Sequence, residues 1–118
     1  MNYRKIYDSL IFHAKRRGFK KLDKNDYKYQ YLETHHITPK SWNGGNEECN
    51  LVNLTAREHF IAHRLLLKIS ELEYGKTSKE YCAALSSLNL MSSENKGGIR
   101  ITSRTYSAIR QKFSELQH

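Results

Sequence analysis

Two pairs of histidines are the side chains of this chain best suited to do chemistry. His35 and His36 are neighbours in the stretch LETHHITPK, and His59 and His63 are four residues apart in AREHFIAHRLL. Side chains four apart share one face of a helix, so His59 and His63 can bind one metal ion. Neighbours in a strand leave by opposite faces, which places an imidazole on each side of the backbone. The helical spacing alone is a weak indication of a metal site, because histidines four residues apart are also common on exposed helix surfaces.

Local patterns predict the elements that carry the first pair. YKYQYLETHHI (27–37) alternates like a strand, and Pro39 should end it, because proline cannot donate to a ladder. Its alternate tyrosines are expected to pack as a ladder on one face: Tyr27, Tyr29 and Tyr31. A loop containing Gly44 and Gly45 follows, and then a short strand at 50–54. The segment is therefore predicted to form a small two-stranded element.

Helices are predicted on both sides of this element. An apolar stripe predicts a helix over 3–17 that ends at Gly18. Thr55 and Glu58 have the form of a capping box, which begins a helix running to about Tyr74. Three further features are expected: a helix over 81–91 opened by a second capping box at 77–80, a loop at 92–98, and a basic amphipathic helix over 103–116. The fold class is therefore α+β, mainly helical, in a single domain over 1–118.

The net charge of +8 is unevenly distributed. Residues 1–31 carry +6, residues 32–96 carry −1 and residues 97–118 carry +3. This distribution is expected of a protein whose basic flanks bind a polyanion while the nearly neutral middle segment acts on it chemically. Charge kept only for solubility is the alternative explanation. No apolar run approaches the roughly 20 residues of a membrane span, and no signal peptide is evident, so a cytoplasmic location with reduced thiols at Cys49 and Cys82 is expected.

The segment ETHHITPKSWNGGNEECNLVNLTAREHFIAH resembles the HNH nuclease motif. In that motif a β-hairpin packs on a helix around one divalent cation, the ββα-metal fold. His36 matches the first H, Asn50 the N and His59 the second H, at spacings of 14 and 9 residues. The metal-site histidines are similar to those of colicin DNases. The segments AREHFIAHRLL and SRTYSAIR resemble small phage-encoded HNH homing or nicking endonucleases. The resemblance implies a ββα-metal core at about 31–74, with basic helical flanks at 1–30 and 76–118.

The resemblance also implies a role for each matched residue. His35, His59 and His63 would hold the metal, and His36 would take a proton from the attacking water. Asn50 would pin the hairpin loop and, through it, the orientation of the His36 ring.

The ligand set departs from many HNH proteins, which have Asp where this chain has His35. Glu33 lies two residues earlier on the same strand face, so we expect it to fix the tautomer of His35. A site of imidazoles alone suits zinc, nickel or manganese, whereas magnesium prefers oxygen ligands. The family resemblance still allows magnesium. The expected cofactor is therefore one divalent metal ion (Mg²⁺, Mn²⁺, Zn²⁺ or Ni²⁺), with the species open.

Basic side chains near the motif and in the flanks are the expected DNA contacts. Neutralising phosphates with such residues gives affinity that is sensitive to salt and largely independent of sequence. The candidates are Lys40, Arg57 and Arg64 near the motif, Lys15, Arg16, Arg17, Lys20 and Lys21 in the first flank, and Arg104 and Arg110 in the last.

The function implied is a metal-dependent HNH DNA endonuclease that leaves 5′-phosphate and 3′-hydroxyl ends. Its partner would be DNA, double-stranded, with no membrane and no small-molecule substrate, and the protein would be a monomer or weak dimer. The alternative is a DNA-binding or regulatory module whose histidines hold a structural zinc without catalysis. A secreted bacteriocin-like toxin would share the chemistry, but no receptor-binding or translocation segment is evident. Target sequence, native metal, nick versus double-strand break and activity on RNA are left open.

Overall fold

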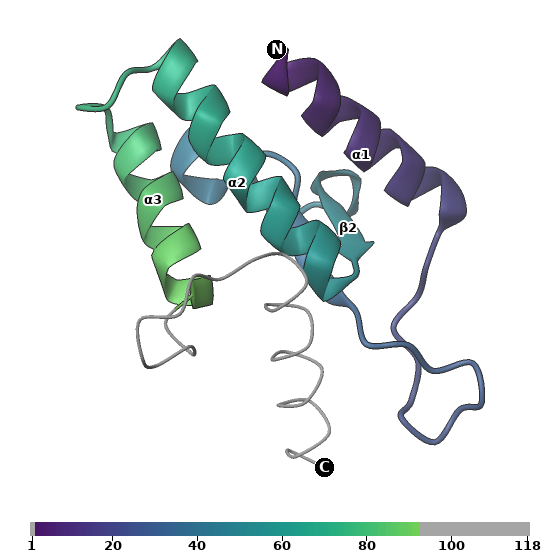
Figure 1. The fold of residues 1–118 in the computed structure, drawn as a ribbon. Helices are drawn as coiled ribbons and strands as arrows, with labels where there is room; N and C mark the ends of the chain where they lie inside the picture. Colours follow the sequence, from purple (N-terminus) through teal and green to yellow (C-terminus); the bar gives the residue numbers. More distant parts are fainter. Residues whose placement is uncertain (1, 93–118) are drawn as a thin grey trace.

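A computed structural model describes residues 2–92, which form an α+β fold dominated by helices (Figure 1). In chain order the elements are α1 (Tyr3–Arg17), β1 (Glu33–His36), the 3-10 turns η1 (Lys40–Trp42) and η2 (Glu48–Asn50), β2 (Leu51–Leu54), α2 (Ala56–Glu73) and α3 (Lys79–Ser92). The predicted fold class is confirmed, including the order of hairpin and helix. The predicted C-terminal helix at 103–116, most of the predicted loop before it, and the candidates Arg104 and Arg110 lie outside the described residues.

Helices α1 and α2 lie side by side and run in opposite directions (Figure 1). Arg4 near the start of α1 pairs with Glu73 at the end of α2, at 2.9 Å. Arg17 at the end of α1 pairs with Glu58 in the first turn of α2. Between these ion pairs the buried side chains of both helices meet those of β2 in one core: Tyr7, Ile11, Ala14, Val52, Leu54, Ala62, Leu66 and Ile69. The first helix therefore covers the hairpin–helix unit rather than standing apart from it.

Both ends of α1 are where the sequence predicts them. The side chain of Asn2 accepts a hydrogen bond from the amide of Lys5 at 3.0 Å, which caps the first turn. Gly18 ends the helix with φ of 61°, the left-handed conformation that glycine adopts without steric cost.

The two strands form an antiparallel hairpin of four residues each. Glu33 pairs with Leu54 and His36 pairs with Leu51, so the histidine pair lies at the loop end of β1. The predicted strand at 27–37 is therefore wrong over its first six residues, and the predicted tyrosine ladder is wrong with it. Tyr27 is 90% exposed.

Local hydrogen bonds explain the missing strand. The side chain of Asp23 accepts from the amide of Asn25, and that of Asp26 accepts from the amide of Lys28, both at 2.8 Å. Such bonds hold the backbone in turns and compete with pairing in a sheet. In addition β2 has only four residues, all of which already pair with β1.

Helix α2 begins with the predicted capping box. The side chain of Thr55 accepts from the amide of Glu58 at 3.2 Å, and the Glu58 carboxylate accepts from the amide of Thr55 at 2.8 Å. The box fixes the direction in which α2 leaves β2, and therefore where its first two turns point. Gly75 follows the last turn with φ of 88°, as predicted.

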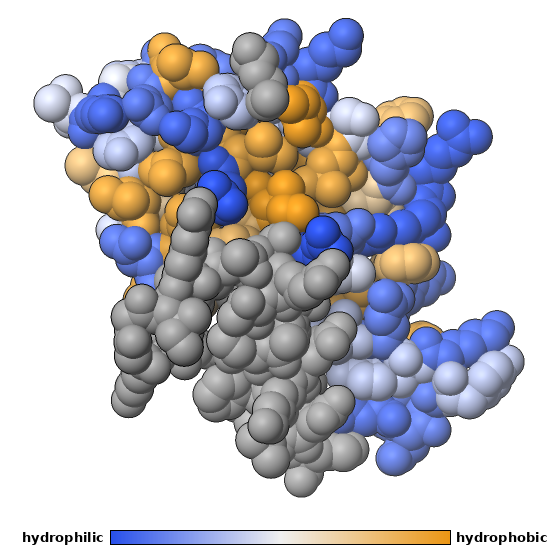
Figure 2. Space-filling model, in the orientation of Figure 1, coloured by the Kyte–Doolittle hydropathy of each residue, from blue (hydrophilic) through white to orange (hydrophobic). Residues whose placement is uncertain are grey.

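Helix α3 packs along α2 (Figure 1). Leu88 and Met91 lie against the buried Ala56 and Phe60. Ser78 rather than the predicted Thr77 caps α3, since its hydroxyl accepts from the amide of Tyr81 at 3.0 Å. Apolar side chains gather over α2 and beside it, whereas hydrophilic ones cover the outer side of α1 and the loop after it (Figure 2). None of the described helices has the length and apolar character needed to cross a membrane.

The loop between the strands folds back tightly on itself. A Cβ atom on Gly44 would lie 1.8 Å from the carbonyl oxygen of Thr38, which is backbone and cannot step aside. A Cβ atom on Gly45 would meet only the side-chain carboxylate of Glu47, at 2.1 Å. Glycine is therefore required at the first position by the close approach of two backbone segments.

Replacing Gly44 with alanine should lower the free energy of unfolding by about 1–3 kcal/mol, because the loop must open to admit the methyl group. Gly45→Ala is the matched control and should cost less, since the Glu47 side chain can rotate away. Urea unfolding of both variants measures the difference. Equal stability of the two variants would contradict the close approach of Gly44 to the backbone of Thr38.

Candidate metal centre

Three of the predicted histidines meet at one point of the fold. His35 comes from β1, and His59 and His63 come from successive turns of α2. Each offers a ring nitrogen, and these atoms all lie within 4.8 Å of one another. The ring centroids are 5.1 Å apart for His35 and either partner and 4.7 Å apart for His59 and His63. The cluster could hold a metal ion.

The hydrogen bonds of His35 leave one nitrogen for such an ion. His35 is 1% exposed, and its Nε2 lies 2.8 Å from the hydroxyl of Tyr7. Its Nδ1 is buried and has no hydrogen-bond partner among the described residues. A buried polar atom without a partner costs about 1–3 kcal/mol, and a metal ion would remove that cost. The donor set therefore fits a cation.

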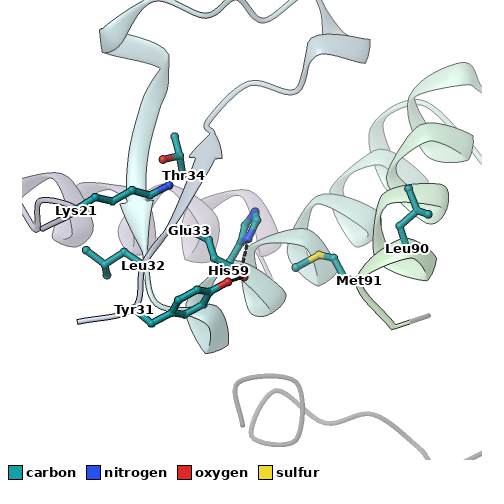
Figure 3. A pocket seen from close by; sticks show the side chains of 8 residues that line it. All are labelled: Lys21, Tyr31, Leu32, Glu33, Thr34, His59, Leu90 and Met91. Carbon is teal, nitrogen blue, oxygen red and sulfur yellow. Dashed lines mark hydrogen bonds and ion pairs between the residues drawn. The ribbon is translucent and has the colours of Figure 1, made fainter. Parts of the chain in front are cut away.

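The second candidate ligand, His59, is oriented by a carboxylate. His59 Nδ1 donates to Glu33 Oε1 at 2.7 Å, and the hydroxyl of Tyr31 donates to Glu33 Oε2 (Figure 3). This leaves His59 Nε2 free to bind, and it lies 3.1 Å from His63 Nε2. A carboxylate that holds the far nitrogen of a metal-binding histidine fixes its ring and makes it a better ligand.

Glu33 thus orients a different ligand from the one the sequence predicts. We expected it to act on His35, because the two share a strand face. The carboxylate instead reaches across to α2 and binds His59, while Nε2 of His35 is turned toward α1. Sharing a strand face did not determine the partner, because the packing of α2 brings His59 Nδ1 within hydrogen-bond distance of the carboxylate.

Burial keeps His35 and His63 uncharged at neutral pH. Loss of solvent, and to a lesser extent the neighbouring His59 and His63, lower the pKa of His35 to about 2. Burial, followed by the charge of His59, lowers the pKa of His63 to about 4. A ring nitrogen must be deprotonated to bind a metal, so both residues are ready to bind without releasing a proton.

His36 lies beside the cluster in a different environment. Its Nε2 is 2.9 Å from Asn46 Oδ1, which can only accept, so Nε2 carries the proton and Nδ1 is left unprotonated. His36 lines the same groove of about 360 Å³ as His35, His59 and His63. Both of the adjacent histidines at the end of β1 therefore line one groove.

Asn50 closes the loop that carries Asn46. Its Oδ1 accepts from the amide of Thr38 at 2.8 Å, and its Nδ2 donates to the carbonyls of Thr38 and Gly45 at 3.0 and 2.8 Å. These three bonds join the two ends of the loop, and Gly45 directly precedes Asn46. The expected link from Asn50 to the His36 ring therefore has a physical route through Asn46.

The basic candidates fall into three groups. Lys40 lines the histidine groove itself. Lys15, Lys20 and Lys21 line a neighbouring groove of about 560 Å³ that shares Thr34 with it. Arg16, Arg57 and Arg64 are exposed but line none of the grooves around the hairpin. Lys21 reaches toward Thr34 at the edge of the histidine cluster (Figure 3).

Arg17, another predicted DNA contact, is engaged in an ion pair at the start of α2. Both of its terminal nitrogens donate to the carboxylate of Glu58, next to His59 in the chain. The carboxylate neutralises part of the charge that Arg17 would offer a phosphate. The DNA contact of Arg17 stays a prediction.

Two residues of the site were missed by sequence reasoning, Tyr7 and Asn46. Tyr7 is 28 residues before His35 and belongs to a stripe that predicts only a buried helix face. Asn46 lies in the loop, and nothing in its local sequence distinguishes it from Asn43. No signal in the chain other than the fold itself connects either residue to a histidine.

Comparison with known proteins adds an independent finding. The chain is 42% identical over 116 residues to probable mobile endonuclease D of Enterobacteria phage T4, covering 98% of this chain and 42% of that protein. It is 49% identical over 69 residues to probable mobile endonuclease E of the same phage, covering 58% and 43% of the two chains. Probable mobile endonuclease B of that phage is 49% identical over 72 residues, covering 61% and 26%. The expected similarity to phage endonucleases is confirmed.

The chain spans less than half the length of these relatives. No family model matches it. No solved structure matches it either.

The metal-free protein should lose stability as the pH falls below about 6.5. Unfolded histidines bind a proton near that pH, whereas folded His35 and His63 have pKa values of about 2 and about 4. The unfolded state therefore binds more protons below pH ~6.5, and each residue adds a slope of about 1.4 kcal/mol per pH unit. Urea unfolding of metal-free protein between about pH 7 and pH 5 measures the slope.

A matched pair of variants separates the site from the rest of the chain. His63→Gln should reduce the slope, while His13→Gln, on the exposed side of α1, should leave it unchanged. A wild-type slope in His63→Gln would show that His63 is not held uncharged by the fold.

Proposed function

We propose that this chain is a metal-dependent DNA endonuclease of the HNH type, nicking or homing, that hydrolyses phosphodiester bonds. The observation that carries the proposal is the groove shared by four histidines, of which three offer converging nitrogens and the fourth has a free Nδ1. The names of the phage relatives support endonuclease activity and DNA as the substrate.

Each of the four histidines has a role in the proposed hydrolysis, either as general base or as metal ligand. His36 Nδ1 accepts the proton of the attacking water, a task suited to an imidazole near neutral pH. When bound, a divalent ion supplies Lewis-acid stabilisation of negative charge on the phosphate. His35, His59 and His63 would hold it, and because these ligands are neutral its full charge is available to the phosphate. The expected products carry a 5′-phosphate and a 3′-hydroxyl.

The surrounding residues hold the substrate and the base. Asn46 keeps the proton on His36 Nε2, and Asn50 holds the loop from which Asn46 extends. Lys40 adds positive charge at the histidine groove. In the neighbouring groove, Lys15, Lys20 and Lys21 would contact phosphates of the DNA away from the cleaved bond. Because one groove can act on only one DNA strand at a time, a single protein chain should cut one strand of the duplex.

A purely structural zinc site accounts less well for these features. Structural zinc sites usually have four protein ligands, whereas the cluster has three in the described part of the chain. A structural site also has no use for a fourth histidine with a free nitrogen beside it. The metal species remains open between Mg²⁺, Mn²⁺, Zn²⁺ and Ni²⁺.

A supercoiled plasmid incubated with the protein and each of these metals should be relaxed by nicking, and end-sequencing should find 5′-phosphates. His36→Ala should reduce the rate by about 10²–10⁴-fold, because the general base is lost. His13→Ala is the control and should cut like wild type. Undiminished cutting by His36→Ala would reject the assignment of the base.

His59→Ala should weaken metal binding, whereas His36→Ala should not, because only the first removes a ligand. Isothermal titration calorimetry with Zn²⁺, Ni²⁺ and Mn²⁺ measures both variants. Circular dichroism after chelation tests the structural-zinc alternative, since a catalytic site should leave the metal-free protein folded. Unfolding on chelation would favour the alternative.

A further inference from the structure

A tyrosine from outside the hairpin–helix unit contacts the buried ligand of the metal centre. Tyr7 of α1 is 1% exposed, and its hydroxyl oxygen lies 2.8 Å from His35 Nε2 and 2.6 Å from the carbonyl oxygen of Ile37. We propose that Tyr7 is a positioning residue that selects the tautomer of His35 and so presents Nδ1 to the metal. This proposal rests on the proposed function only in assuming that the cluster binds a metal.

The assignment follows from counting protons. A phenol has one proton to donate, and the carbonyl oxygen of Ile37 can only accept. If Tyr7 donates to Ile37, its oxygen is free to accept, and His35 Nε2 must supply the proton for the 2.8 Å contact. The other tautomer, with the proton on Nδ1, would force Nε2 and the carbonyl of Ile37 to compete for one phenol proton.

The rejected tautomer also fails on the other side of the ring. A proton on Nδ1 would be buried without an acceptor, because Nδ1 has no partner among the residues described. One tautomer therefore makes both hydrogen bonds and leaves a lone pair for a cation. The other loses one bond and buries an unsatisfied donor, which costs about 1–3 kcal/mol. An imidazole free in water has no such constraint.

The packing around Tyr7 keeps its hydroxyl in position beside His35. Ile11 and Ala14 are buried beside it on the same face of α1, and the ion pairs Arg4–Glu73 and Arg17–Glu58 hold the helix at both ends. Helix α1 is thus part of the metal centre, although the motif-like segment begins about thirty residues later in the chain.

The tautomer can be read directly in the wild-type protein. Long-range ¹H–¹⁵N correlation spectra of metal-free, ¹⁵N-labelled protein distinguish a protonated ring nitrogen from an unprotonated one. We expect His35 to show a protonated Nε2 and an unprotonated Nδ1, as a single species. An unprotonated Nε2, or a mixture of tautomers, would overturn the proposal without bearing on catalysis.

The role of the hydroxyl is tested by removing it. Tyr7→Phe should leave both nitrogens of His35 without a protein partner, so the spectrum should show mixed tautomers. Affinity for Zn²⁺ or Ni²⁺, measured by calorimetry, should fall by about 10–100-fold, the usual effect of losing the partner of a metal-binding histidine. Tyr3→Phe, the same change one turn earlier on α1, is the control and should bind like wild type.

Folding is monitored by circular dichroism, so that lost structure is not mistaken for lost positioning. A folded Tyr7→Phe with wild-type affinity and a single His35 tautomer would overturn the proposal. If wild-type protein binds no metal yet shows the expected tautomer, the proposed metal-dependent function fails while the assignment of Tyr7 stands. The two failures are therefore distinguishable.

Discussion

The burial of one uncharged imidazole, His35, is the constraint on which the rest of the site depends. Buried polar atoms need partners, and among the described residues the fold provides one for only one of the two ring nitrogens of His35. Tyr7 satisfies Nε2, whereas Nδ1 has no hydrogen-bond partner in the described part of the chain and is left for a cation. If His35 were on the surface, water could satisfy either nitrogen, and neither the tautomer nor the direction of the lone pair would be fixed. Three elements must pack together to create this environment, so the ligand geometry is a product of the core.

The parts of the structure that the sequence predicts correctly all depend on local signals. Helix α1 is specified by an apolar stripe and by Gly18, and the start of α2 by the Thr55–Glu58 capping box. The convergence of His59 and His63 follows from helical spacing alone. Their meeting with His35 required more, namely the resemblance to a hairpin–helix motif, because nothing in the spacing of 24 residues between His35 and His59 predicts a contact.

The predictions that failed concern interactions between residues that are far apart in the sequence. Alternation over 27–37 predicts a strand, but a strand needs a neighbour, and β2 is too short to pair with the first half of that segment. Glu33 was assigned to the wrong histidine for a related reason: the strand face fixed where its side chain left the backbone, whereas the packing of α2 decided what it met. The ion pair of Arg17 with Glu58 was likewise not predicted, because it depends on where the start of α2 lies.

The hydrogen-bond partners of His35 and His36 explain why these two histidines are adjacent. In both rings Nε2 is protonated and engaged, by Tyr7 in one case and Asn46 in the other, and in both Nδ1 is left with its lone pair. The difference between them is access. His35 is sealed in the core, where its lone pair can meet only the ligands of α2, whereas His36 is partly exposed at the groove, where its lone pair can meet water. Under the proposed function, one tautomer held in two environments one residue apart would supply both the ligand and the base. The alternating faces of a strand are the simplest way to place neighbours in two such environments.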